Sequence, residues 1–159
     1  GFCLWREGRE GAICGRRAGV PGGGAATLVV GGRIHVMGGI AGEAVSARHD
    51  IFDPETGSWG EGPALPAARS GSAVALYQGR VHLFGGQSSD GRTTLQTHIS
   101  WAPGDTVWTE DADLPAPRTG AEAVVLERGI FLIGGGSGGG FFAPFTALDA
   151  TDVFLDDAS

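Results

Sequence analysis

The stretch Arg80-Val81-His82-Leu83-Phe84-Gly85-Gly86 is an apolar run that ends in two glycines, and it decides the fold because it recurs. The chain of 159 residues has three such double glycines, with spacings of 47 and 49 residues: Gly38-Gly39, Gly85-Gly86 and Gly134-Gly135. Another glycine precedes each pair by 14 residues, and a short strand-like run leads into each pair. Self-similarity at a fixed period of this length is the signature of a repeat architecture.

The second half of the repeat keeps the same period. Trp59 and Trp108 are 49 residues apart, and so are Arg69 and Arg118. The pairs Leu65-Pro66 and Leu114-Pro115 are separated by the same 49 residues. We therefore expect repeat units at 21–66, 67–115 and 116–159. Residues 1–20 are poorly patterned, and the edge of a preceding unit is one interpretation of them.

Each unit has the pattern of four antiparallel strands. The runs 25–30 and 72–77 are small, β-branched or apolar throughout, which predicts inner strands buried on both faces. Gly31-Gly32 and Gln78-Gly79 predict two-residue hairpin turns that need positive φ, whereas Glu127-Arg128 predicts a shifted or strained turn. The last strand of a unit carries the lone tryptophan, which we expect to face the next unit. Four antiparallel strands in about 50 residues are typical of a propeller blade.

These units resemble the repeats of the kelch family. The resemblance covers about residues 22–159 and rests on Arg69-Ser70-Gly71, the run 80–86, the stretch 51–59 and Leu65-Pro66. It implies an all-β fold of kelch-type blades with four antiparallel strands each, forming an open partial propeller in this chain. By the repeat, the third unit ends before its tryptophan and is expected to lack its outer strand. Fewer than about four blades cannot close a ring, so we expect further blades from a longer chain or from oligomerisation.

Charge and hydropathy limit the partners. The 11 basic residues are all arginine, against 18 acidic residues, for a net charge of −7. Nothing in this pattern resembles a basic stripe, so a nucleic-acid partner is not expected. No apolar run approaches the roughly 20 residues of a membrane-spanning helix. Cytoplasmic and exported locations both remain open.

The cysteines and histidines do not predict a metal or a cofactor. His35 and His82 occupy the same place in successive units, and His49 and His98 do likewise, so we expect them not to converge on one ion. Cys3 and Cys14 could form a disulfide in an exported protein, or be two free thiols in a reducing compartment.

The candidate ligand-binding residues lie between and after the strands. Arg69 and Arg118 stand between the outer strand of one unit and the inner strand of the next. The kelch resemblance implies that such arginines contact acidic peptide ligands at the mouth of the central channel, which suits the bidentate guanidinium. The alternative is that they anchor the loop on backbone carbonyls. The loops 41–47, 87–94 and 137–146 differ between units, as recognition loops do, and the second adds the candidates Ser88, Asp90 and Arg92.

The expected function is a non-catalytic recognition module that binds a protein or glycan ligand at these loops. The alternative, drawn from the same resemblance, is the propeller portion of an exported carbohydrate-active enzyme similar to galactose oxidase or the bacterial sialic acid epimerases. Galactose oxidase chemistry needs a tyrosine crosslinked to a cysteine and a second tyrosine. Tyr77 is the only tyrosine of this chain, so the chain alone cannot form that copper site.

Overall fold

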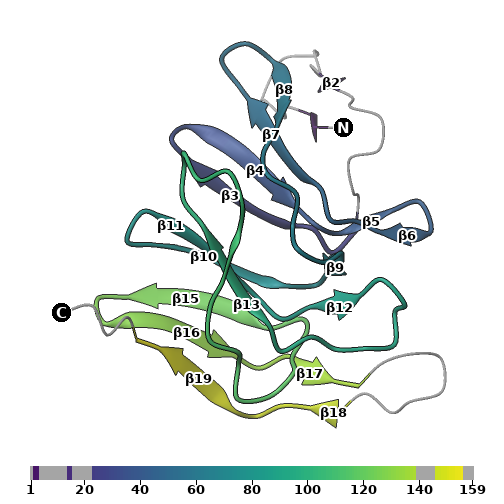
Figure 1. Ribbon diagram of the computed structural model, residues 1–159, viewed down its shortest axis with the longest axis vertical. Coiled ribbons are helices and arrows are strands. Elements are labelled where there is room, and N and C mark those ends of the chain that lie inside the picture. The colour runs from purple at the N-terminus through teal and green to yellow at the C-terminus, as the bar shows by residue number, and fades with distance from the viewer. Residues whose placement is uncertain (1, 4–13, 16–22, 139–145, 156–159) are drawn as a thin grey trace, which may run out of the picture.

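Three antiparallel β-sheets follow one another along the chain in the computed structural model, which describes residues 2–3, 14–15, 23–138 and 146–155 (Figure 1). We call them the first, second and third blades. The first blade has the strand order β3-β4-β7-β8, the second β10-β11-β13-β14 and the third β15-β16-β19. Their bounds are β3 (Ala26–Val30), β4 (Arg33–Met37), β7 (His49–Asp53), β8 (Ser58–Glu61), β10 (Ala73–Tyr77), β11 (Arg80–Phe84), β13 (His98–Trp101), β14 (Thr109–Glu110), β15 (Glu122–Leu126), β16 (Gly129–Ile133) and β19 (Thr151–Phe154).

Every neighbouring pair of strands within a blade is antiparallel. The prediction of an all-β fold with kelch-type antiparallel blades is therefore confirmed. The third blade has three strands within the described residues. The described residues contain no helix that is long and apolar enough to cross a membrane.

The hairpin turns at the start of each blade have two residues. In the first turn Gly31 and Gly32 have φ of 55° and 77°, and in the second Gln78 and Gly79 have φ of 49° and 76°, as predicted. The third turn is not shifted, because Leu126 lies opposite Gly129 and leaves the same two-residue connection. Within the described residues Gln78 is the one non-glycine with positive φ, so the third hairpin closes with a different backbone geometry. The predicted shift is therefore wrong, and the strained alternative stays a prediction.

The prediction that the inner strands are buried on both faces is wrong for β3, and in β10 it holds only at the start of the strand. In β3 Ala26 is buried, but Val29 is 59% exposed. In β10, which has a blade on either side, Ala73 packs in the core toward the third blade and Val74 packs toward the first. The first and third blades each have a blade packed against one face only within the described residues. In β3 exposed positions therefore alternate with buried or half-buried ones, and in β15 only Ala123 is half-buried.

Two hydrophobic cores fill the spaces between successive blades. The first joins Met37 and Leu65 of the first blade to Leu83, Trp101 and Trp108 of the second. The indole Nε1 of Trp108 donates a hydrogen bond to the Pro63 carbonyl at 3.0 Å. Trp108 therefore faces the preceding blade, not the next one as expected. The second core has the following members: Ala73, Ala75, Phe84, Leu114, Ala121, Ile130 and Leu132.

Short two-stranded sheets follow the double glycines and lie together along one edge of the molecule (Figure 1, right). The hairpin turns β3-β4, β10-β11 and β15-β16 lie along the opposite edge. We call the first the loop edge and the second the hairpin edge. The sheets of the loop edge pair β5 (Ile40–Ala41) with β6 (Ala44–Val45), β9 (Arg69–Ser70) with β12 (Gln87–Ser88), and β17 (Gly136–Ser137) with β18 (Thr146–Ala147).

The N-terminal segment contributes one described strand pair, β1 (Phe2–Cys3) and β2 (Cys14–Gly15). Its antiparallel register sets the backbone of Cys3 opposite that of Cys14. The disulfide stays a prediction, and most of the interval 1–20 lies outside the described residues.

Candidate functional site

Arg69 joins the first blade to the second. Its backbone carbonyl accepts a hydrogen bond of 2.7 Å from the Gly39 amide of the first blade. Its guanidinium Nη1 donates to the Gly85 carbonyl of the second blade at 3.2 Å, and its Nε donates to the Ala67 carbonyl at 3.4 Å. The residue is only 2% exposed, and burial lowers the pKa of its guanidinium while the charge of Glu110 opposes that shift. The group nevertheless stays charged at neutral pH.

Arg118 joins the second blade to the third in the same way. Its carbonyl accepts a hydrogen bond from the Gly86 amide at 2.9 Å. Its Nη1 donates to the carbonyls of Gly134 and Ala150, both at 3.1 Å, and its Nη2 donates to the Asp152 carboxylate at 2.5 Å. The residue is 1% exposed. The guanidinium is thus surrounded by acceptors of the following blade.

This geometry matches the loop-anchor alternative for both arginines. It also accounts for the glycine that begins each of the first two double-glycine pairs. A Cβ on Gly38 would lie 2.4 Å from the Arg69 carbonyl oxygen, and a Cβ on Gly85 would lie 2.1 Å from the Arg118 carbonyl oxygen. Only glycine permits so close a backbone approach. Direct contact of Arg69 or Arg118 with a ligand stays a prediction.

Asp90 organises the loop 87–94 of the second blade. One of its carboxylate oxygens accepts hydrogen bonds from the amides of Arg92 at 2.8 Å and Thr93 at 3.1 Å, and from the Ser88 hydroxyl. These donors, with Ser88 first, lower the pKa of Asp90. Residues 89–93 are all exposed, so the turn holds Arg92 out to solvent in an ordered backbone. The predicted residues Ser88, Asp90 and Arg92 therefore do come together.

The loops of the other blades differ from this one. The first blade has the tight hairpin β5-β6, in which the exposed Gly42 has φ of 65°. The second loop reaches the third blade, because the Thr94 hydroxyl donates to the Gly138 carbonyl at 3.1 Å. Residues 139–145 of the third loop lie outside the described part. The loop edge thus presents a different backbone shape in each of the first two blades.

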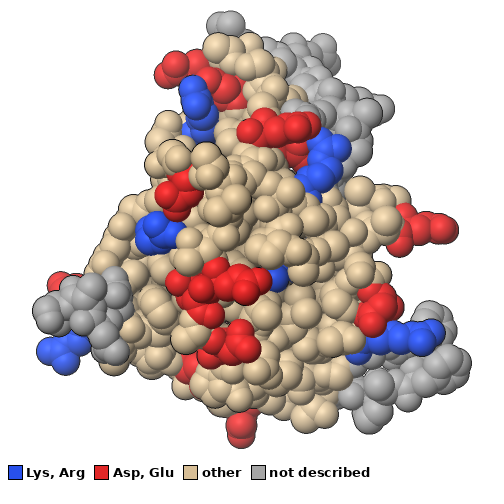
Figure 2. Space-filling view, viewed as in Figure 1, with Lys and Arg blue, Asp and Glu red and all other residues tan. Residues whose placement is uncertain are grey.

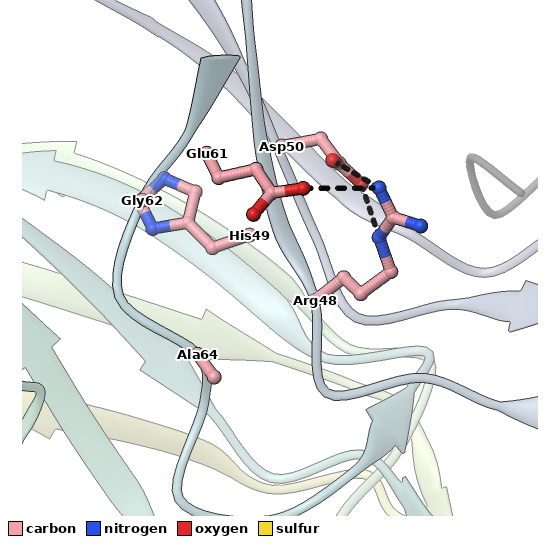
Figure 3. Close-up of a pocket in the computed structure, with 6 residues that line it drawn as sticks. All are labelled: Arg48, His49, Asp50, Glu61, Gly62 and Ala64. Carbon is pink, nitrogen blue, oxygen red and sulfur yellow. Dashed lines mark hydrogen bonds and ion pairs between the residues drawn. The ribbon is translucent and has the colours of Figure 1, made fainter. Parts of the chain in front are cut away.

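Sequence analysis missed a buried ion pair on the first blade. Asp50 is fully buried and accepts hydrogen bonds from Nε and Nη2 of Arg48, at 3.1 and 2.7 Å. The hydrogen bonds to Asp50 raise the pKa of Arg48, and Glu61 Oε1 lies 3.8 Å from the same Nη2 of Arg48 (Figure 3). These residues line a cavity of about 290 Å³. The signal was present, because Asp50 stands at the repeat position that Ile99 fills in the second blade.

The first two blades each bring their own two histidines together, which the sequence analysis did not predict. His35 Nδ1 lies 2.8 Å from His49 Nε2, and His82 Nδ1 lies 2.9 Å from His98 Nε2. All four residues are buried. Repeat-equivalent histidines are indeed in different blades.

Charges on the surface are mixed. Figure 2 shows acidic side chains interspersed with isolated arginines on the visible face, without a continuous basic surface there. That face lacks the array of positive charge by which proteins bind nucleic-acid phosphates.

Comparison with known proteins finds partial similarity to two plant proteins. The F-box/kelch-repeat protein At5g39560 of Arabidopsis thaliana is 36% identical over 64 residues, which is 40% of this chain and 15% of that protein. The F-box/kelch-repeat protein At4g19870 of the same plant is 32% identical over 59 residues, or 37% of this chain and 15% of that protein. No family model matches the chain. The matched stretches and the antiparallel blades together support kelch-type repeats in this chain.

Proposed function

We propose that this chain is a protein-binding module and that its ligand contacts the loop edge of a kelch-type propeller. The similarity to kelch-repeat proteins supports an interaction module in general terms. The observation that carries the choice of edge is the Asp90 turn, which presents an exposed Arg92 from an ordered backbone. Pre-ordered loops bind with a smaller entropic cost than loops that must order on binding.

The hairpin edge offers much less variety. Its first two turns are two-residue connections of the same type, and each repeats the geometry of the other. Recognition surfaces are usually built from loops that vary on a rigid scaffold. Ser88, Asp90 and Arg92 therefore carry this proposal. Arg69 and Arg118 belong to it as the residues that hold the loop edge in place, and a direct role in binding an acidic ligand remains to be tested.

Site-specific photo-crosslinking in the source cell tests the proposal. A photo-reactive amino acid at Arg92 should give a covalent protein adduct, whereas the same amino acid at the exposed Gln78 on the hairpin edge should not. Replacing Asp90 with alanine in the Arg92-labelled protein should reduce the yield, because the turn loses its acceptor. Equal adducts at both positions, or adducts at Gln78 alone, would contradict the assignment. A glycan adduct at Arg92 would support binding at the loop edge but would contradict the proposal that the ligand is a protein.

A further inference from the structure

Three side chains of metal-ligating type converge in the second blade. His82 comes from β11, His98 from the start of β13, and Asp111 directly follows β14. One ligand atom from each lies within 4.8 Å of the others. His98 Nε2 is central, at 2.9 Å from His82 Nδ1 and 3.6 Å from Asp111 Oδ2. We call these residues the second-blade triad.

We propose that the second-blade triad binds a divalent transition-metal ion, with zinc as the best match. Zinc accepts two imidazole nitrogens and a carboxylate oxygen at about 2.0–2.2 Å, and a tetrahedron of that size has edges of about 3.3 Å. The separations of 2.9 and 3.6 Å lie on either side of that value, and all three ligand atoms lie within 4.8 Å of one another. Coordination would replace the hydrogen bond between the two imidazoles and draw the three ligand atoms together around the ion, with water in the fourth position.

The two histidines of the triad are buried, since His82 and His98 are 6% and 1% exposed. Asp111 Oδ2 is buried and has no hydrogen-bond partner among the described residues. A buried carboxylate oxygen without a donor is unfavourable, and a cation would compensate it.

Aromatic packing holds the central ligand in place. The ring of His98 stacks on Phe84 with a centroid distance of 4.3 Å and meets the edge of Phe154 at 4.8 Å. Ligands fixed on strands by packed neighbours are more precisely placed than ligands on loops. A cavity of about 380 Å³ beside His98, with Asp113 and Asp152 in its lining, offers an approach for a cation.

The first blade provides an internal comparison. It has the same histidine pair, but the position equivalent to Asp111 is Gly62. A Cβ on Gly62 would lie 2.3 Å from His49 Nδ1, so the first blade has no room for a third side-chain ligand at this place. Two imidazoles alone do not make a zinc site of the usual three or four protein ligands. The metal is therefore expected in the second blade and not in the first.

Zinc titration by calorimetry of the metal-stripped full chain tests the proposal. Cys3 and Cys14 are changed to serine in every variant, so that thiols cannot bind the metal. The parent should bind one zinc ion per chain. Asp111→Gly gives the second blade the pattern of the first, and Asp111→Asn keeps the shape of the side chain. Each should weaken binding by at least about 10- to 100-fold, since a lost ligand should cost at least as much as the loss of its outer-shell partner.

His49→Gln is the matched control in the first blade and should leave zinc affinity unchanged. The thermal midpoint gives a second readout, because zinc should raise it in the parent and in His49→Gln but not in Asp111→Gly. Absence of binding by the folded parent would overturn the proposal. Unchanged affinity in both Asp111 variants, or an equal loss in His49→Gln, would overturn it as well.

Discussion

His49 is a buried imidazole among other rings. It is 2% exposed, and its ring centroid lies 4.9 Å from Trp101 and 5.6 Å from Trp108. Burial lowers its pKa from 6.5 to about 4, and the charge of His35 acts in the same direction. The Pro63 carbonyl and Asp50 oppose the shift more weakly. The folded protein therefore takes up this proton at lower pH than the unfolded chain does.

This shift predicts acid destabilisation through His49. Because the folded pKa lies below the unfolded one, the unfolded chain binds more protons between about pH 6.5 and 4, and stability falls as pH falls through this window. A shift from 6.5 to about 4 corresponds to about 3 kcal/mol in the free energy of unfolding, as an order of magnitude. Urea unfolding at about pH 7.5 and about pH 4.5 measures this change in the free energy of unfolding. His49→Gln should show a smaller difference between the two pH values, and an equal difference would contradict the assignment.

Arg118 is expected to act mainly on stability. Arg118→Ala would leave the Gly134 and Ala150 carbonyls and the Asp152 carboxylate without their donor. Breaking a buried charged pair costs about 3–5 kcal/mol in the free energy of unfolding. Arg118→Lys should recover only part of that stability, because lysine lacks the planar guanidinium that donates several hydrogen bonds at once. Arg92→Ala, on the exposed turn, should stay within about 0.5 kcal/mol of the parent. If Arg118→Ala kept full stability but lost the crosslinked ligand, the ligand-contact interpretation would hold instead.

Among the elements of the fold, the double-glycine corners should tolerate substitution least. Gly85 has φ of 59°, and its Cβ would meet the Arg118 carbonyl oxygen, so alanine there adds a backbone collision to the conformational strain. Gly79 also has positive φ, but nothing lies within 4 Å of its Cβ position. Gly79→Ala should cost about 1 kcal/mol and Gly85→Ala more than about 3 kcal/mol in urea unfolding. Equal losses would show that the collision is relieved by a backbone shift.

The repeat period predicted the elements but not the register between them. The strands, the first two hairpin turns and the double glycines could be read directly, since they depend on local pattern. The meeting of His82 and His98 could not, because it depends on Phe84 lying opposite His98, which places His82 diagonally across the pair of strands. The loop between β11 and β13 differs in length from its counterpart in the first blade, so spacing alone does not reveal that register.

The sequence left two alternatives open for the arginines, ligand contact or loop anchor, for a related reason. Their period marked Arg69 and Arg118 as part of the repeat, but the Nη1 atoms of both guanidinium groups find their acceptors in the following blade. Gly85 and Gly134 are 16 residues further along the chain. Whether such a side chain reaches solvent or a carbonyl is decided by how two blades pack, and no local pattern contains that information.

At the scale of the whole molecule, the second blade connects the other two. It contributes Leu83, Trp101 and Trp108 to one core and Phe84 to the other. Each core therefore depends on one interface between neighbours, as in other repeat proteins whose units contact mainly the units beside them. A substitution that destabilises one interface should therefore affect the stability of the far blade less than it would in a protein with a single shared core.

Hydrogen exchange followed by mass spectrometry can measure this separation. Trp108→Ala removes a 6%-exposed side chain from the first core and should cost about 3–5 kcal/mol, with faster exchange in β4, β7 and β13 and little change in β16. Leu132→Ala, in the second core, should accelerate exchange in β16 and β19 and leave β4 protected. Val107→Ala is the control beside Trp108, because Val107 is 68% exposed and should change neither region. If the exchange rate rose uniformly over all three blades in both core variants, the blades would form one cooperative unit, because neither interface could then open without the other.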